Sequence, residues 1–172
     1  MTTPAAFDPL RLFGELNEAG VRYVVIGAVA GRLLGSPTVT RDLDICHATD
    51  STNLAALVNV LQRLNARLRG TDRPVPFRLD ARSLARADSF TFATDAGDLD
   101  LLARPAGTEG FEDLVRSAEA TDLDGMTVLV ASIGDLIRMK RAAGRPKDLI
   151  ELEVLGALRD ELDQAAADEL GR

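Results

Sequence analysis

The stretch VVIGAVAGRLLGSPTVTRDLDICH, residues 24–47, decides the fold. Three β-branched residues at 24–26 predict a buried strand, and the small residues after them predict a turn that opens a short helix from Gly27 to Gly35. A second strand then carries Asp42 and Asp44. Because alternate residues of a strand face the same side, both carboxylates point one way, while the leucine and isoleucine beside them point into the core.

Two carboxylates this close repel each other unless a cation lies between them. Oxygen ligands on a rigid strand suit Mg²⁺, which also binds phosphates, and the helix that begins at Gly27 would turn free backbone N–H groups toward an anion. The pattern predicts a site for a nucleoside triphosphate and one or two Mg²⁺ ions, with Gly27, Ala28, Thr40 and Arg41 at the nucleotide. An edge strand with solvated aspartates is the alternative.

Length and composition suit one globular domain with a proper core, since the chain has 172 residues and 46% of them are hydrophobic. A single cysteine, Cys46, excludes an internal disulfide. The sequence shows no signal peptide and no apolar run of about 18 residues, so we expect a cytoplasmic protein with no membrane partner. A net charge of −7 is unsuited to indiscriminate binding of nucleic acid.

Hydrophobic periodicity and turn residues predict the other elements. These are a helix over Pro9–Ala19, a helix from Ser51 to about Leu68, a hairpin over residues 89–104 turning at 95–97, a short acidic helix over 108–117, a hairpin over 120–130, a helix from Ser132 to Gly144 and another from Pro146. The expected N-caps are Asp8, then Asp50 or Ser51, and Ser132.

Seven arginines and only two acidic residues lie between residues 63 and 86. This arginine track is consistent with an ordinary solvated surface, and equally with a path for a polyanion. If the polyanion is RNA, the residues expected to contact it are Arg63, Arg67, Arg69, Arg73 and Arg78. Arg63 and Arg67 would then lie one helical turn apart on a polar face.

Further charged residues fall on the predicted strands and helices. The second strand of the 89–104 hairpin places Asp98 and Asp100 on one face, although Asp98, at the turn, also fits an exposed hairpin end. Lys140 is seven residues after Ile133, on the apolar side of its helix, where it either contacts phosphate or extends its stem to solvent. Asp148 lies on the inward stripe of the last helix, or simply favours its first turn.

These residues resemble the nucleotidyltransferase superfamily, in which a glycine turn is followed about a dozen residues later by two acids separated by an apolar residue. Gly27, Asp42 and Asp44 match that pattern, while Ala28 replaces the usual glycine or serine. Residues 139–149, MKRAAGRPKDL, are similar to the AbiEii-type toxin branch of the superfamily.

The resemblance implies roles for the remaining acids and the lysine. Asp100 would be the third carboxylate, as metal ligand or as base for the attacking hydroxyl. Lys140 and Asp148 match positions that complete the active site, and Glu151 stands where many members have an aspartate.

We therefore expect an α/β (α+β) nucleotidyltransferase fold in a single domain, residues 1–172, with a small mixed sheet within residues 1–131 and helices over 132–172. The expected enzyme is a Mg²⁺-dependent toxin that adds a nucleoside monophosphate from an NTP to the 3′ end of tRNA and is held in check by an antitoxin. The alternatives are an antibiotic-type enzyme that modifies a small molecule, and a non-catalytic interaction protein.

Overall fold

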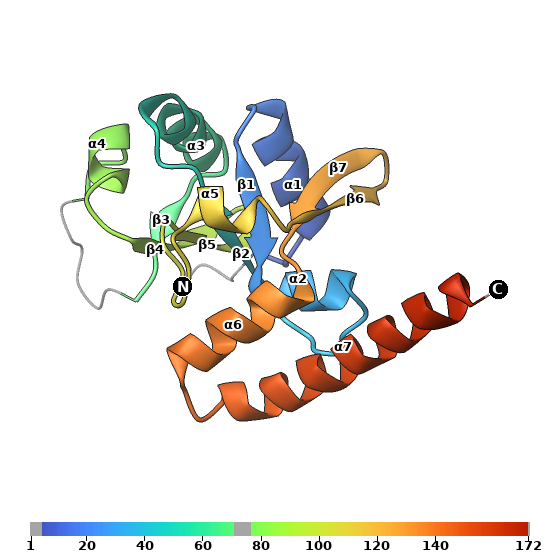
Figure 1. Ribbon diagram of the computed structural model, residues 1–172. Helices are drawn as coiled ribbons and strands as arrows, with labels where there is room; N and C mark the ends of the chain where they lie inside the picture. Colours follow the sequence, from blue (N-terminus) through green and yellow to red (C-terminus); the bar gives the residue numbers. More distant parts are fainter. Residues whose placement is uncertain (1–4, 71–76, 172) are drawn as a thin grey trace.

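A mixed sheet forms the middle layer of the protein (Figure 1). The computed structural model describes residues 5–70 and 77–171, and within them the sheet has seven strands in the order β3-β4-β5-β2-β1-β7-β6. The strands are β1 (Tyr23–Ile26), β2 (Asp42–His47), β3 (Arg67–Leu68), β4 (Ser89–Thr94), β5 (Gly97–Leu102), β6 (Glu119–Leu123) and β7 (Met126–Val130). β2 pairs in parallel with β5 and antiparallel with β1, so the two acidic strands are neighbours.

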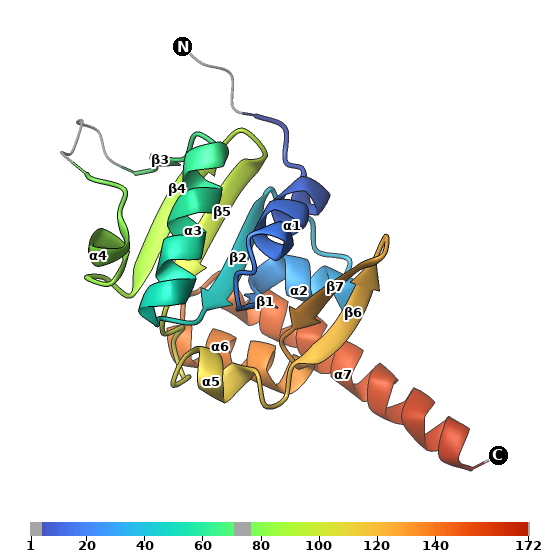
Figure 2. The ribbon, with the colours of Figure 1, turned by 90° about the horizontal axis from the view of Figure 1, so that it is seen from above.

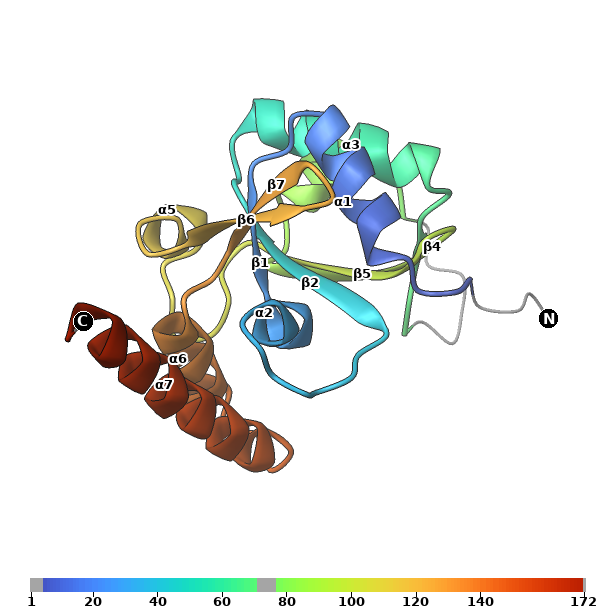
Figure 3. The same ribbon diagram turned by 90° about the vertical axis from the view of Figure 1, so that its right-hand side faces the viewer.

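Helices cover both faces of the sheet (Figures 1 and 3). One face carries α1 (Pro9–Glu18), α3 (Ser51–Arg63) and α4 (Ala81–Leu84), and the other carries α2 (Gly27–Leu33), α6 (Ile133–Ala143) and α7 (Asp148–Leu170). The short α5 (Phe111–Leu114) precedes the β6–β7 hairpin. The C-terminal half of α7 extends away from the sheet (Figure 2).

The core follows from the alternation of apolar residues in β2 and β5. Leu43, Ile45, Leu99 and Leu101 are fully buried, whereas the aspartates between them are only partly buried. Leucines at helical spacing in α1 and α3 are buried with them, so one face of each helix becomes core. Every residue of β1 is buried, because this strand lies within the sheet and is covered on both faces.

The predicted helix caps are confirmed. Asp8, Asp50 and Ser132 each accept a hydrogen bond from a backbone N–H in the first turn of α1, α3 and α6. α6 ends at Gly144, whose φ of +60° is a left-handed conformation that glycine adopts readily. These caps fix the start of α6 and the turn into α7.

Three predicted boundaries are wrong. α3 ends at Arg63 rather than near Leu68, because Asn65 has a φ of +49° and the chain turns back so that Arg67 and Leu68 pair with β4. Arg67 is therefore on a strand and not one helical turn from Arg63. The acidic helix spans only residues 111–114, and α7 begins at Asp148 rather than Pro146.

The predicted fold class is confirmed, including the mixed sheet and the helical C-terminal part. In the part of the chain that the structure describes, no helix combines the length and the apolar character needed to cross a membrane.

Asn53 joins the start of α3 to the ends of β1 and β2. Its side-chain oxygen accepts from the backbone N–H of Arg22 at 2.7 Å, and its Nδ2 donates to the carbonyls of Arg22 and Ala48 at 3.1 and 2.8 Å. Asn53 is 3% exposed, and its removal takes the acceptor from the Arg22 N–H and one of two donors from each carbonyl, which keep their bonds from Ala48 N and His47 Nδ1.

We predict that Asn53→Ala lowers the free energy of unfolding by about 2–4 kcal/mol, measured by urea denaturation. Asn59→Ala, at an exposed position of the same helix, is the matched control and should change stability by less than about 0.5 kcal/mol. Equal stabilities of the two variants would contradict this account of the α3 junction.

Candidate active site

A cavity of about 580 Å³ lies between the acidic strands and the helices α2, α6 and α7. Seven of the residues predicted for the site line it: Gly27, Ala28, Thr40, Asp42, Asp44, Asp100 and Lys140. Two predicted residues do not line the cavity: Asp148, which is buried, and Arg41, which is exposed. The fold thus brings together residues separated by more than a hundred positions in the chain.

The parallel pairing of β2 with β5 sets the three carboxylates side by side. Asp44 is directly opposite Asp100 in the register, and Asp42 is opposite Asp98. Burial, together with the charges of Asp42 and Asp100, raises the pKa of Asp44 to about 7. Burial also raises the pKa of Asp100. The sheet therefore concentrates negative charge at one point, where a cation would be stabilised.

Gly27 provides the space that Asp44 occupies. Ile26 is opposite Asp44 in the pairing of β1 with β2, so the chain enters α2 directly beside this carboxylate. Gly27 has a φ of +67°, and a Cβ at this position would collide with the Asp44 side chain. Glycine is required here both by conformation and by space, which gives a structural reason for the turn predicted from the sequence.

The other two carboxylates have partners within the protein. The Thr40 hydroxyl donates to Asp42, and Arg69 forms ion pairs with Asp98 and Asp100, its Nη2 lying 3.2 Å from Asp100 Oδ1. The Nε atom of Arg69 is buried without a hydrogen-bond partner among the described residues. Arg69 thus balances the charge of the third carboxylate, a role that the sequence did not predict.

A second charged cluster lies on α6 and α7. The Lys140 side chain is 17% exposed, its Nζ is 3.3 Å from Asp148 Oδ1, and it also pairs with Glu151. Asp148 accepts further hydrogen bonds from Arg145 N, Nε and Nη2 at 3.1, 2.9 and 3.2 Å. The Arg145 side chain is the main reason why the pKa of Asp148 falls to about 2. Asp148 therefore holds Lys140 and Arg145 in place at the wall of the cavity.

Arg145 and Lys147 also line the cavity, and neither was predicted as a site residue. Both lie within the segment 139–149, and their positive charges near Lys140 could have indicated from the sequence that they belong to the site. With Lys140, they place three cations across from the three carboxylates.

Most arginines of the track lie away from this cavity. Arg63 pairs with Glu15, and Arg78 pairs with Asp80. Arg67 is exposed on β3, and Arg73 lies outside the described residues. Whether these residues contact RNA stays a prediction.

The residues fit a divalent cation in their chemistry. Asp42, Asp44 and Asp100 supply oxygen ligands of the kind that Mg²⁺ prefers, and burial, together with the charges of Asp42 and Asp100, raises the pKa of Asp44. Thr40 holds the side chain of Asp42, and Arg69 holds that of Asp100. Within residues 5–70 and 77–171, no group of three His, Cys, Asp or Glu side chains forms a ready metal site.

Comparisons with known proteins agree with the fold. The family model described as aminoglycoside-2''-adenylyltransferase matches residues 10–155. A lincomycin-bound structure of the lincosamide antibiotic adenylyltransferase LnuA is 13% identical, with a TM-score of 0.60 over 91% of this chain and 99% of that chain. The antibiotic-resistance factor ANT(2'')-Ia is 15% identical, with a TM-score of 0.52 over 95% and 93%. The comparison with curated proteins gave no match.

The fold and the matches define a member of the nucleotidyltransferase superfamily, as the sequence predicted. Within it, the chain belongs to the aminoglycoside-2''-adenylyltransferase family, because that model covers most of its length. The AbiEii-type branch predicted from residues 139–149 is not the family of this match.

The raised pKa of Asp44 predicts a pH-dependent stability. Below the ordinary aspartate pKa of 3.8, Asp44 is protonated in the folded and the unfolded state, and its titration does not change the free energy of unfolding. Between that value and about 7 the unfolded chain loses the proton and the folded protein keeps it, so wild-type stability falls as pH rises. Without metal, Asp44→Asn should therefore be more stable than wild type at pH 8 by about 1–3 kcal/mol, and equal to it near pH 3.

Denaturation with urea at several pH values, in the presence of EDTA, measures this difference. Asp124→Asn, in the exposed β6–β7 turn, is the control and should follow wild type at every pH. Excess Mg²⁺ should stabilise wild type and narrow the gap at pH 8. A gap that is independent of both pH and Mg²⁺ would contradict the crowding of the carboxylates.

Proposed function

We propose that the protein transfers an adenylyl group from ATP to a hydroxyl group of a small polar molecule, as an antibiotic-type adenylyltransferase. The observation that carries the proposal is that a single cavity collects Asp42, Asp44 and Asp100 on one side and Lys140 and Arg145 on the other. Membership of the aminoglycoside-2''-adenylyltransferase family supports the choice of ATP and of a small acceptor.

Each side of the cavity has a part in this reaction. Asp42 and Asp44 would hold Mg²⁺, which neutralises charge on the phosphates when it is bound. Asp100, next to Asp44 on β5, accepts the proton of the attacking hydroxyl, and Arg69 orients its carboxylate. Gly27 lets the Asp44 carboxylate lie directly against the start of α2, where it lines the cavity.

Lys140 and Arg145 stabilise the negative charge that develops on the departing pyrophosphate. Lys140 is paired with Asp148 and Glu151, and Asp148 keeps its bonds to Arg145 when Lys140 turns to a phosphate. The buried Asp148 is then a positioning residue rather than a metal ligand, since it is 1% exposed and has no share in the cavity lining.

The size of the cavity and the arginine pairing both favour a small acceptor. A volume of about 580 Å³ is within the usual range for small-molecule sites. Arg63, Arg69 and Arg78 direct their guanidinium groups to acids of the same chain, which weakens their attraction for a polyanion.

Transfer of a nucleotide to the 3′ end of tRNA, by a toxin under the control of an antitoxin, is the second candidate. Its support is that three arginines are exposed: Arg67 on β3, Arg82 on α4, and Arg86 between α4 and β4. Both candidates require the same carboxylates, so the acceptor decides between them.

One assay separates the two candidates. The protein is incubated with Mg²⁺ and each α-³²P-labelled NTP, together with aminoglycosides, a lincosamide or total RNA, and the labelled products are resolved. We expect label from ATP in a small molecule, and a loss of at least ~100-fold in Asp44→Asn, because the site loses a charged ligand.

Asp124→Asn is again the matched control and should retain full activity. Label at the 3′ ends of tRNA, with none in small molecules, would support the second candidate, transfer of a nucleotide to tRNA. Equal labelling by wild type and Asp44→Asn would contradict a reaction at this site.

A further inference from the structure

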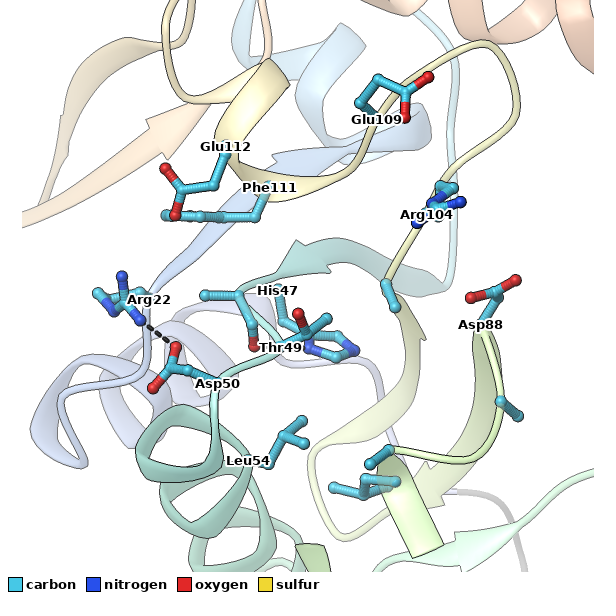
Figure 4. Close-up of a pocket in the computed structure, with 15 residues that line it drawn as sticks. Arg22, His47, Thr49, Asp50, Leu54, Asp88, Arg104, Glu109, Phe111 and Glu112 are labelled. Atoms are coloured by element: carbon cyan, nitrogen blue, oxygen red, sulfur yellow. Dashed lines mark hydrogen bonds and ion pairs between the residues drawn. The ribbon is translucent and has the colours of Figure 1, made fainter. Parts of the chain in front are cut away.

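A second cavity, also of about 580 Å³, lies where β2 ends and α3 begins (Figure 4). Its walls include buried residues from four elements: His47 of β2, Leu54 of α3, Leu84 of α4 and Phe111 of α5. His47 faces the side of the sheet opposite to Asp42 and Asp44, because side chains alternate along β2. The cavity is therefore distinct from the candidate active site.

His47, the single histidine of the chain, carries an unused acceptor into this cavity. The residue is 3% exposed, and its Nδ1 lies 3.0 Å from the carbonyl oxygen of Ala48. A carbonyl only accepts, so Nδ1 donates, and Nε2 of the neutral ring is left as an acceptor. Burial lowers the pKa of His47, which keeps the ring neutral at pH 7. Within the described residues, Nε2 has no hydrogen-bond partner.

The rim of the cavity carries more negative than positive charge. Figure 4 shows Asp88 on one side of His47 and Glu109 and Glu112 across the cavity. None of these three side chains takes part in an ion pair among the residues that the structure describes. Arg22 is engaged with Asp50 and with the ring of Phe111, 5.7 Å from its centroid, which leaves Arg104 as the remaining rim cation.

The ligand must match both the free Nε2 acceptor of His47 and the positions of the acids on opposite sides of the cavity. An anion would meet unpaired carboxylates and an imidazole that cannot donate to it. A protonated amine has donors only, so it suits Nε2 and a carboxylate equally well. Because the acids lie on opposite sides of the cavity, a molecule with two or more separated amines would reach them together with His47.

We propose that this cavity binds a small linear polyamine, with one ammonium group donating to Nε2 of His47 on the side of Asp88 and another reaching Glu109 and Glu112 across the cavity. Phe111, Leu54 and Leu84 contact the methylene groups between the two charges. The proposal is independent of the reaction at the other cavity.

NMR tests the contact directly, because a long-range ¹H–¹⁵N spectrum reports on one histidine only. Titration with 1,4-diaminobutane should move the Nε2 resonance in a saturable way toward the hydrogen-bonded value, with little change at Nδ1. The isosteric 1,4-butanediol, at the same ionic strength, should bind at least ~10-fold more weakly, because it lacks the charges. A fixed Nε2 resonance, or equal binding of the diol, would overturn the proposal.

Variants distinguish this cavity from general attraction to an acidic protein. Glu109→Gln with Glu112→Gln should weaken diamine binding at least ~10-fold in calorimetry, and both positions are exposed, so the fold is kept. Glu161→Gln with Glu169→Gln, on the exposed end of α7, is the matched control and should bind as wild type. Asp44→Asn should also bind as wild type, and a loss there would assign the diamine to the other cavity. A response of Nε2 to Zn²⁺ but not to the diamine would overturn the polyamine class.

Discussion

The parallel pairing of β2 with β5 is the constraint on which the rest of the structure depends, because it places Asp44 beside Asp100 and Asp42 beside Asp98. Apolar residues between these acids are fully buried, so the register cannot slip without turning charges into the core. Burial of the strand thus enforces the crowding of the carboxylates. In the absence of a cation, this arrangement destabilises the charged form of Asp44, and its pKa is raised.

Neighbouring elements are built around this concentration of charge. Gly27 leaves room for the Asp44 side chain, and Arg69 pairs with Asp98 and Asp100 from the far side. Lys140 and Arg145 are held by the buried Asp148 at the opposite wall. Cations therefore lie on two sides of the acids, as the proposed binding of a metal–nucleotide complex requires. Because these cations already have acidic partners, the proposed binding of a triphosphate would require an exchange of ion pairs, most directly at Lys140 and Glu151.

The sequence predicted the parts of this site that follow from local periodicity. The alternation in residues 42–45 and the glycine turn at Gly27 gave the acidic strand, and the apolar stripe of α6 placed Lys140 on the sheet side. Arg69 could not be found in this way, since its partners lie 29 and 31 residues further along the chain. They meet it only because β3 pairs with β4 and β4 pairs with β5. The end of α3 was missed because Leu64 and Leu68 continue its leucine spacing, while the left-handed Asn65 ends it. The sequence pattern identified the superfamily but not the family whose model matches residues 10–155.

A structure of the protein with Mg²⁺ and a non-hydrolysable ATP analogue is the measurement that tests the central claim most directly. Our account predicts the metal on Asp42 and Asp44, the triphosphate between these acids and α6, and Lys140 released from Glu151 to a phosphate oxygen. Nucleotide bound elsewhere on the protein, or bound in this cavity with Lys140 still paired to Glu151 and no metal on the aspartates, would contradict it.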